Sequence, residues 1–137
     1  MVITTKLQKR FADMDMFGHA NNAAQQQYFD LGKLDFFREV LGLNNGRDEL
    51  RLVMATTTNN YYRQITMSDN VEVTTRVRKV GTKSLHLFQQ IIDNAGTVYS
   101  DSATVMVAFD FETQQTVAIP DSWRTKLEEY LVHSEGQ

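Results

Sequence analysis

The sequence contains no cysteine, a single proline and no long apolar run among its 137 residues. Without cysteine the chain can form neither disulfides nor thiolate metal sites. Its N-terminus, MVITTKLQKR, lacks the apolar core of a secretory signal, and no stretch approaches the length of a transmembrane helix. We therefore expect a cytoplasmic protein without a membrane partner.

An excess of basic charge is also missing, because 14 Lys and Arg residues stand against 17 Asp and Glu residues. Nucleic-acid binding needs a concentrated basic surface, so we expect no nucleic-acid partner. A few local Lys or Arg side chains could still hold a small anionic ligand. His19, His86 and His133 lack the spacing of a helical metal pair, and we expect no metal site.

What is present is an ordinary globular composition, with 42% hydrophobic and 23% charged residues. No internal repeat, low-complexity segment or linker divides the chain. We expect residues 1–137 to form a single domain, which is long enough to bury a core without staples.

Helical periodicity dominates the first third of the chain. After a first strand in residues 2–11, we expect a long helix from Asn22 to Leu41, with Gly42 as its C-cap. The apolar residues at helical intervals are Tyr28, Leu31, Leu34, Phe37 and Leu41, with Phe29, Phe36 and Val40 on an adjoining stripe. Because this arc is wide, we expect the helix to be embedded rather than to lie on a surface.

After residue 50 the apolar period changes to two, which predicts antiparallel strands. Residues 67–70, 81–82 and 94–96 are typical of hairpin turns. The last strand, Tyr99–Phe111, has one apolar face formed by Ala103, Val105, Val107, Phe109 and Phe111, and Pro120 precedes a short helix to about Val132. The order predicts an α+β fold, in which a curled antiparallel sheet of about five strands wraps the central helix. Long strand edges favour a homodimer, or a tetramer built as a dimer of dimers.

The most informative segment is RFADMDMFGHANNAAQQQYFD, from Arg10 to Asp30. It places two aspartates directly ahead of a helix N-terminus, where free backbone N–H groups and the helix dipole favour negative charge. A carboxylate held there stays ionised, and the same amides can polarise a substrate carbonyl. The alternative is an ordinary capped helix start without chemistry.

Residues 13–22, DMDMFGHANN, resemble the Asp-x-Asp-x-x-Gly-His-x-Asn-Asn signature of the 4-hydroxybenzoyl-CoA thioesterase-like acyl-CoA thioesterases, which have the hotdog fold. Weaker similarities follow in residues 28–30, 80–84 and 119–123. The resemblance implies the hotdog fold and hydrolysis of an acyl thioester. It also implies that no cofactor is needed, because a thioester is already an activated acyl group.

Carried over residue by residue, the resemblance implies that Asp15 is the catalytic carboxylate, as nucleophile or as general base. The backbone N–H near Asn22 would polarise the thioester carbonyl. His19 either orients Asp15 or the thioester, or is a hydrogen-bonded turn residue. We expect Asp13 to be structural, and Asn21 to act first as a cap.

The candidate substrate-binding residues are Gly18, Asn21, Tyr62, Lys83 and Ser84. Lys83, with Arg76, Arg78 and Lys79, could hold CoA phosphates or simply form a solvated face. Tyr62 could line an acyl slot or pack in the core. The chain departs from the family in the run Gln25-Gln26-Gln27 and in Lys33, which stands where arginine is usual. These departures indicate a more polar acyl pocket.

The leading interpretation is a thioester hydrolase acting on acyl-CoA, with an acyl carrier protein thioester as a variant. The main alternative is a hotdog protein that binds acyl-CoA or a small molecule without turnover. A dehydratase would need a histidine–carboxylate pair, for which His19 and Asp15 are the candidates. A purely structural dimer leaves the Asp-rich turn unexplained.

Overall fold

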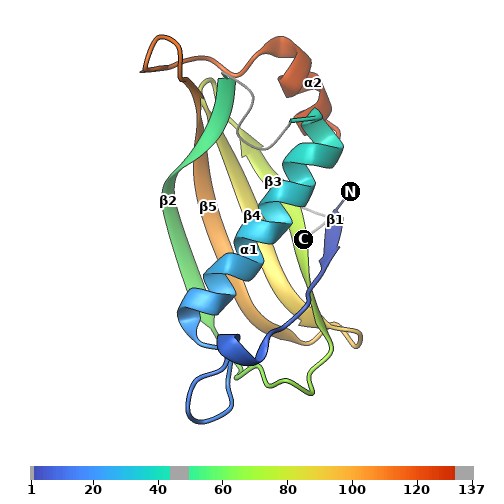
Figure 1. Ribbon diagram of the computed structural model, residues 1–137. Coiled ribbons are helices and arrows are strands. Elements are labelled where there is room, and N and C mark those ends of the chain that lie inside the picture. The colour runs from blue at the N-terminus through green and yellow to red at the C-terminus, as the bar shows by residue number, and fades with distance from the viewer. Residues whose placement is uncertain (1, 44–49, 132–137) are drawn as a thin grey trace.

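One long helix crosses the concave face of a curled antiparallel sheet in the computed structural model, which describes residues 2–43 and 50–131 (Figure 1). The helix is α1 (Asn22–Phe36), and a π-helical turn, η2 (Phe37–Leu41), continues it. The other elements are β1 (Ile3–Lys6), the 3₁₀ turn η1 (Phe11–Asp13), β2 (Leu50–Tyr61), β3 (Val71–Val80), β4 (Ser84–Asp93), β5 (Val98–Asp110), β6 (Gln115–Thr116) and α2 (Asp121–Glu128). The predicted α+β hotdog arrangement is confirmed.

The strand order of the sheet is β1-β3-β4-β5-β2, and the short β6 pairs with β5. The hairpins β3–β4 and β4–β5 turn at residues 81–83 and 94–97, as predicted. The predicted hairpin turn at Met67–Asn70 is wrong, because β2 pairs with β5 and β3 lies between β1 and β4. Turn residues indicate that the chain reverses, but they do not determine which strand becomes the neighbour.

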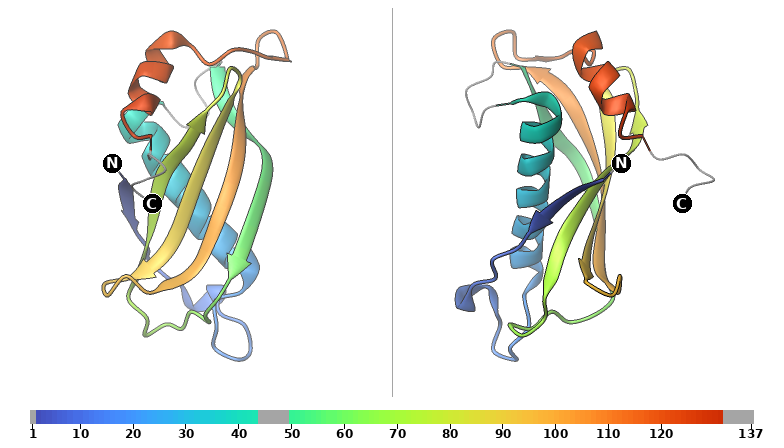
Figure 2. Two further views of the ribbon diagram at one scale, coloured as in Figure 1. Left: turned by 180° about the vertical axis from the view of Figure 1, so that it is seen from behind. Right: turned by 90° about the vertical axis from the view of Figure 1, so that its right-hand side faces the viewer.

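Only one side of α1 is covered, so the prediction of an embedded helix is wrong. Leu31 and Leu34 remain 48% and 41% exposed in the single chain, because the sheet curls around the opposite side. The side view in Figure 2 shows this two-layer arrangement. Gly42 adopts φ 67° and its N–H caps the helix end at Arg38 and Phe37, as predicted.

Helix and sheet are in close contact at Gly32. A Cβ on this residue would lie 2.7 Å from Gln89 Nε2 and 2.8 Å from Val73 Cγ1. Only glycine lets the helix backbone rest directly on the sheet here. The contact sets the height of α1 above β3 and β4.

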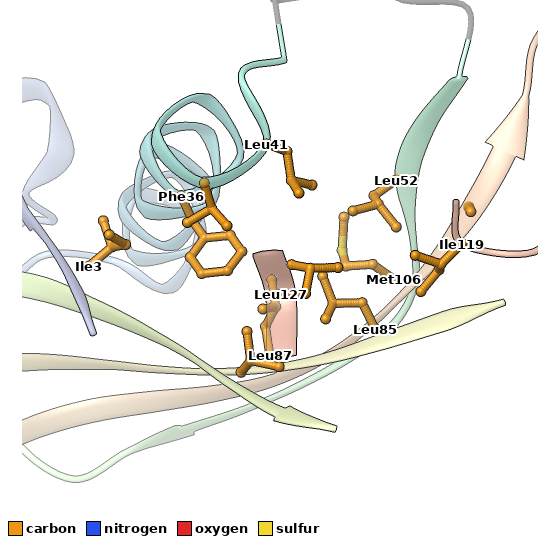
Figure 3. Packing of buried hydrophobic residues seen from close by; sticks show 12 residues of the cluster. Ile3, Phe36, Leu41, Leu52, Leu85, Leu87, Met106, Ile119 and Leu127 are labelled. Carbon is orange, nitrogen blue, oxygen red and sulfur yellow. The ribbon is translucent and has the colours of Figure 1, made fainter. Parts of the chain in front are cut away.

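The larger apolar cluster lies at the C-terminal end of α1, where α2 closes the layers. Phe36 and Leu127 are fully buried there and face Leu87 between helix and sheet (Figure 3). The ring of Tyr130 packs edge-on against Phe36, with centroids 5.9 Å apart. A smaller cluster, which includes Phe29 and Ile65, lies near the N-terminal end. Most of the apolar stabilisation is therefore concentrated at one end of the molecule.

The face of β5 that packs toward α1 is largely polar. Its buried residues are Ser100, Ser102, Thr104, Met106 and Ala108, whereas the predicted apolar face from Ala103 to Phe109 turns away from the helix and is half-buried. Opposite, on β4, Gln89 is also fully buried. A polar strip thus separates the two apolar clusters.

Candidate active site

The Asp-rich segment folds into a tight loop ahead of α1. Met14 and Ala20 form an isolated antiparallel bridge, and the Asp15 N–H donates to the His19 carbonyl at 2.8 Å. Gly18 closes the turn with φ +80°, a conformation that side chains other than glycine rarely adopt, and its N–H donates to the Asp15 carbonyl at 3.0 Å. The loop therefore presents residues 15–18 to solvent.

The carboxylate of Asp15 is held through one oxygen and free at the other. Its Oδ1 accepts backbone N–H groups from Phe17 at 2.9 Å and from His19 at 3.2 Å. The residue is exposed, and Oδ2 has no partner within residues 2–43 and 50–131. Such a carboxylate is oriented by the backbone and remains available as a nucleophile or a base.

His19 contributes to this arrangement through its backbone. Its N–H contacts Asp15, while its imidazole makes no hydrogen bond within the described part of the chain. The contact between the two residues is therefore a turn contact, and the ring is free for a ligand.

Asp13, two residues earlier, is only 3% exposed, and hydrogen bonds hold both of its carboxylate oxygens. Its carboxylate accepts the Arg10 N–H at 2.9 Å, the Arg10 guanidinium at 2.9 Å and the Tyr28 hydroxyl at 2.7 Å. Burial alone would raise the pKa of Asp13, but these donors outweigh it and hold the pKa below its usual value. Burial and the same contact raise the pKa of Tyr28. Asp13 is structural, as expected.

Asn21 is the N-cap of α1, as predicted. Its Oδ1 accepts the Ala24 N–H at 2.7 Å, and its carbonyl accepts the Gln25 N–H at 3.0 Å. Among the described residues this leaves the N–H groups of Asn22 and Ala23 without a partner at the positive end of the helix. They lie just beyond the loop that carries Asp15.

Tyr62 belongs to the same end of the molecule. It follows β2, in the segment whose Ile65 carbonyl accepts the Ala20 N–H at 2.7 Å. Its hydroxyl donates to Asp101 Oδ2 at 2.8 Å, and the ring is 59% exposed, so the alternative of core packing is wrong. The bond to Asp101 raises the pKa of Tyr62.

Lys83 and Ser84 lie at the opposite end, beside α2. The Lys83 carbonyl accepts the Ala108 N–H, and Arg124 of α2 donates to the Gly81 carbonyl at 2.7 Å. The 15 residues of α1 alone span about 22 Å. A single chain therefore does not bring Lys83 and Ser84 to Asp15. His133 lies outside the described residues.

The sequence did not reveal a cavity of about 530 Å³ against the exposed side of α1. Its lining residues are Lys6, Gln8, Arg10, Asp13, Gln27, Tyr28, Asp30, Leu31 and Leu34. The cavity depends on how the chain after β1 passes the helix, which no local pattern predicts. Arg10 lies beside Asp13 at one end of this lining, and Lys6 supplies a second cation to it.

No group of three or more His, Asp or Glu side chains comes together within the described residues in a way that could hold a metal ion. Within the same residues, no helix has the length and apolar character to cross a membrane.

Comparison with known proteins shows which family the chain belongs to. The family model described as the thioesterase-like superfamily matches residues 10–127. The long-chain acyl-CoA thioesterase FadM of Escherichia coli (strain K12) is 26% identical over 135 residues, which cover 93% of this chain and 98% of FadM. The uncharacterized protein YsmA of Bacillus subtilis (strain 168) is 28% identical over 129 residues, covering 94% of this chain and 84% of YsmA.

Two solved structures are similar in both fold and sequence. A predicted thioesterase from Bacillus stearothermophilus has a TM-score of 0.85 and 28% identity, covering 97% of this chain and 98% of that one. A thioesterase from Thermus thermophilus, complexed with coenzyme A and Zn, has a TM-score of 0.79 and 26% identity, covering 93% of this chain and 92% of that one.

Proposed function

We propose that this chain, a member of the thioesterase-like superfamily and therefore a thioester hydrolase, hydrolyses an acyl-CoA to the free acid and CoA. The observation that supports the proposal is that the loop with the backbone-oriented Asp15 carboxylate leads directly into the start of α1, where the Asn22 and Ala23 N–H groups have no partner among the described residues. A carboxylate and preorganised amide donors are the groups that acyl transfer needs. The relative that is named for long-chain acyl-CoA and the one complexed with coenzyme A support CoA as the thiol carrier.

In the proposed mechanism the thioester carbonyl oxygen points at the Asn22 and Ala23 N–H groups. The free Oδ2 of Asp15 either attacks the carbonyl carbon or takes a proton from a water that does so. The carbon–sulfur bond then breaks, and CoA leaves as a thiolate, which receives the proton that Asp15 took from water in the base route, or a proton from solvent water in the nucleophile route. Where Asp15 attacks, water hydrolyses the resulting acyl anhydride in a second step. The amides stabilise the oxyanion throughout, and removing one such group typically costs on the order of 10² to 10³ in rate.

We further propose a homodimer that pairs β2 with its own copy. β2 is an edge strand, and residues 54–58 are exposed on it. Pairing about a two-fold axis perpendicular to the sheet is antiparallel, so each end of one protomer lies beside the opposite end of its partner. Lys83 and Ser84 of the partner subunit would then approach Asp15 and meet the CoA phosphates.

The first experiment measures thiol release from a panel of acyl-CoA thioesters, from acetyl and benzoyl to palmitoyl. Asp15→Asn should lose at least about 10²-fold in kcat/KM. The matched control is Glu72→Gln, because Glu72 lies on β3 between Val71 and Val73, which face α1. Saturable acyl-CoA binding without thiol release would overturn the hydrolase proposal in favour of a binding protein. Release only from acyl carrier protein thioesters would replace CoA as the carrier.

A mixing experiment tests whether the partner supplies Lys83. Asp15→Asn and Lys83→Ala chains are each purified, then mixed under conditions that exchange subunits. If Lys83 acts across the interface, each mixed dimer regains one site with both native residues, and thiol release rises above that of either parent. No gain would overturn the role of Lys83 across the interface, and Lys6→Ala then tests the cavity beside α1. Lys126→Ala, an exposed lysine in α2, is the control.

A further inference from the structure

A continuous polar network joins α1 to the edge strand β2. Asn59 Nδ2 donates to Gln26 Oε1 at 2.7 Å, and Gln26 Nε2 donates to Asp30 Oδ1 at 3.1 Å. In the other direction, Thr57 Oγ1 donates to Asn59 Oδ1 at 3.1 Å. Thr57 also meets the buried hydroxyls of Ser102 and Thr104, each at 3.2 Å. The network uses Gln26, the middle residue of the run Gln25-Gln26-Gln27.

This seam between α1 and β2 is open to solvent. Thr57 and Asp30 are exposed and Asn59 is half-buried, whereas Ser102 and Thr104 behind them are buried. Figure 1 shows the start of α1 beside the lower end of β2, from where the helix crosses the sheet toward β1. A ligand lying along the seam would replace the water that covers these polar groups.

Both ends of the network keep unused hydrogen-bonding capacity. At one end, Lys33 is 4% exposed, and its ammonium has one partner in the described chain, Asp30 Oδ1 at 3.5 Å. Burial lowers the pKa of Lys33 against the opposing effect of Asp30. At the other end, the Tyr61 hydroxyl accepts from Asn59 at 3.3 Å and keeps its own hydrogen for a further acceptor.

The network begins close to the proposed oxyanion site. With a rise of about 1.5 Å per residue, Gln26 lies about 6 Å along the α1 axis from Asn22, and Lys33 about 17 Å. β2 runs antiparallel to this direction, so that Asn59 meets Gln26. An acyl chain that leaves the carbonyl at Asn22 and extends along α1 on this side passes Gln26 first and then Asp30.

We propose, on the basis of the proposed thioesterase function, that the seam binds an acyl chain carrying a hydroxyl group and that Gln26, Asn59 and Thr57 determine this preference. A hydroxyl both donates and accepts, so it can satisfy Lys33, Asp30 or Tyr61. An unsubstituted chain would strip water from these groups and return no hydrogen bond. The preference therefore arises from the penalty on the plain chain as much as from attraction to the hydroxyl.

The test compares decanoyl-CoA with two derivatives, one hydroxylated at the third carbon and one at the chain end. We expect kcat/KM for at least one hydroxylated substrate to exceed that for decanoyl-CoA about tenfold. Equal or lower values for both hydroxylated substrates would overturn this inference and leave the thioesterase standing. Absence of thiol release from all three would overturn the thioesterase proposal and this inference with it.

Matched variants on β2 separate specificity from structure. Thr57→Val and Asn59→Leu remove network groups on the helix-facing side, while Thr58→Val and Asn60→Leu change their neighbours on the opposite face. We expect the first pair to bring the substrate ratio within about twofold of parity, and the second pair to retain it. A merely structural network would lower kcat/KM for all substrates alike, and an unchanged ratio in Thr57→Val and Asn59→Leu would contradict the proposal.

Discussion

The two ends of α1 differ in how far their surroundings are buried. At the C-terminal end Phe36 sits in a closed apolar cluster under α2, with Leu127 and Leu87 against it (Figure 3). At the N-terminal end Met16 and Phe17 project from the Asp15 loop into solvent, 89% and 76% exposed. Burial of apolar side chains at the C-terminal end stabilises the fold, and the N-terminal end remains open for a ligand or a second copy of the chain. In the proposed function, the reacting groups and the larger apolar cluster therefore lie at opposite ends of a single helix.

Substitution at the closed end should cost the most stability. Phe36→Ala should lower the free energy of unfolding by about 3–5 kcal/mol, because it removes a fully buried ring and leaves a cavity. Chemical denaturation measures this loss, and the thiol-release rate per folded molecule should change little. Leu34→Ala, on the exposed side of α1, should cost less than about 0.5 kcal/mol. A comparable cost there would show that a partner covers this side.

At the open end, we expect Asp13 and Asp15 to differ in their effects on stability and on rate. Asp15→Asn should lose about 10²-fold or more in rate at unchanged stability, because asparagine keeps the Oδ1 acceptor for Phe17 and His19. Asp13→Asn should lose about 1.5–3 kcal/mol of stability, because its bonds to Arg10 and Tyr28 are charge-assisted. Thermal unfolding and thiol release on both variants check this. If Asp13→Asn lost rate without losing stability, Asp13 rather than Asp15 would be the catalytic carboxylate.

A methyl group added at Gly32, between the two ends of α1, tests how firmly the helix packs on the sheet. Gly32→Ala should destabilise the fold by about 1–3 kcal/mol, because its Cβ would meet Gln89 and Val73 below van der Waals distance. This exceeds the gain of about 1 kcal/mol from the better helix propensity of alanine. Urea unfolding measures whether the free energy of unfolding falls or rises in Gly32→Ala. Net stabilisation would mean that α1 can lift from the sheet.

The smallest expected effect is the acid dependence of stability. Donors to Asp13 and the Thr66 N–H beside Asp69 hold both pKa values below normal. A lowered folded pKa contributes stability above the unfolded value of about 3.9, and this contribution is lost as pH falls through the folded pKa. The free energy of unfolding should therefore decline below about pH 4. Asp69→Asn should flatten that decline, and an unchanged slope would remove Asp69 from the explanation.

Much of the fold and part of the site could be predicted because they depend on neighbours in sequence. The Asn21 cap, the Gly42 terminus and the two hairpins follow from local backbone preferences. The Asp-rich turn was likewise visible, because its hydrogen bonds join residues within a few positions of each other. The burial of Asp13 could not be read from its neighbours in sequence, because it depends on Tyr28, a turn and a half into the helix.

By itself, the sequence determined the element types, their order and the loop that carries Asp15, since periodicity and turn chemistry act over a few residues. Only the tertiary structure decided that β2 pairs with β5, that the apolar face of β5 turns outward and that Leu31 stays exposed. It alone separated Lys83 from Asp15 within one chain and brought Gln26 to Asn59. These outcomes depend on which surfaces meet across long sequence separations. Strand pairing and burial there are set by the whole fold, so local sequence patterns do not predict them.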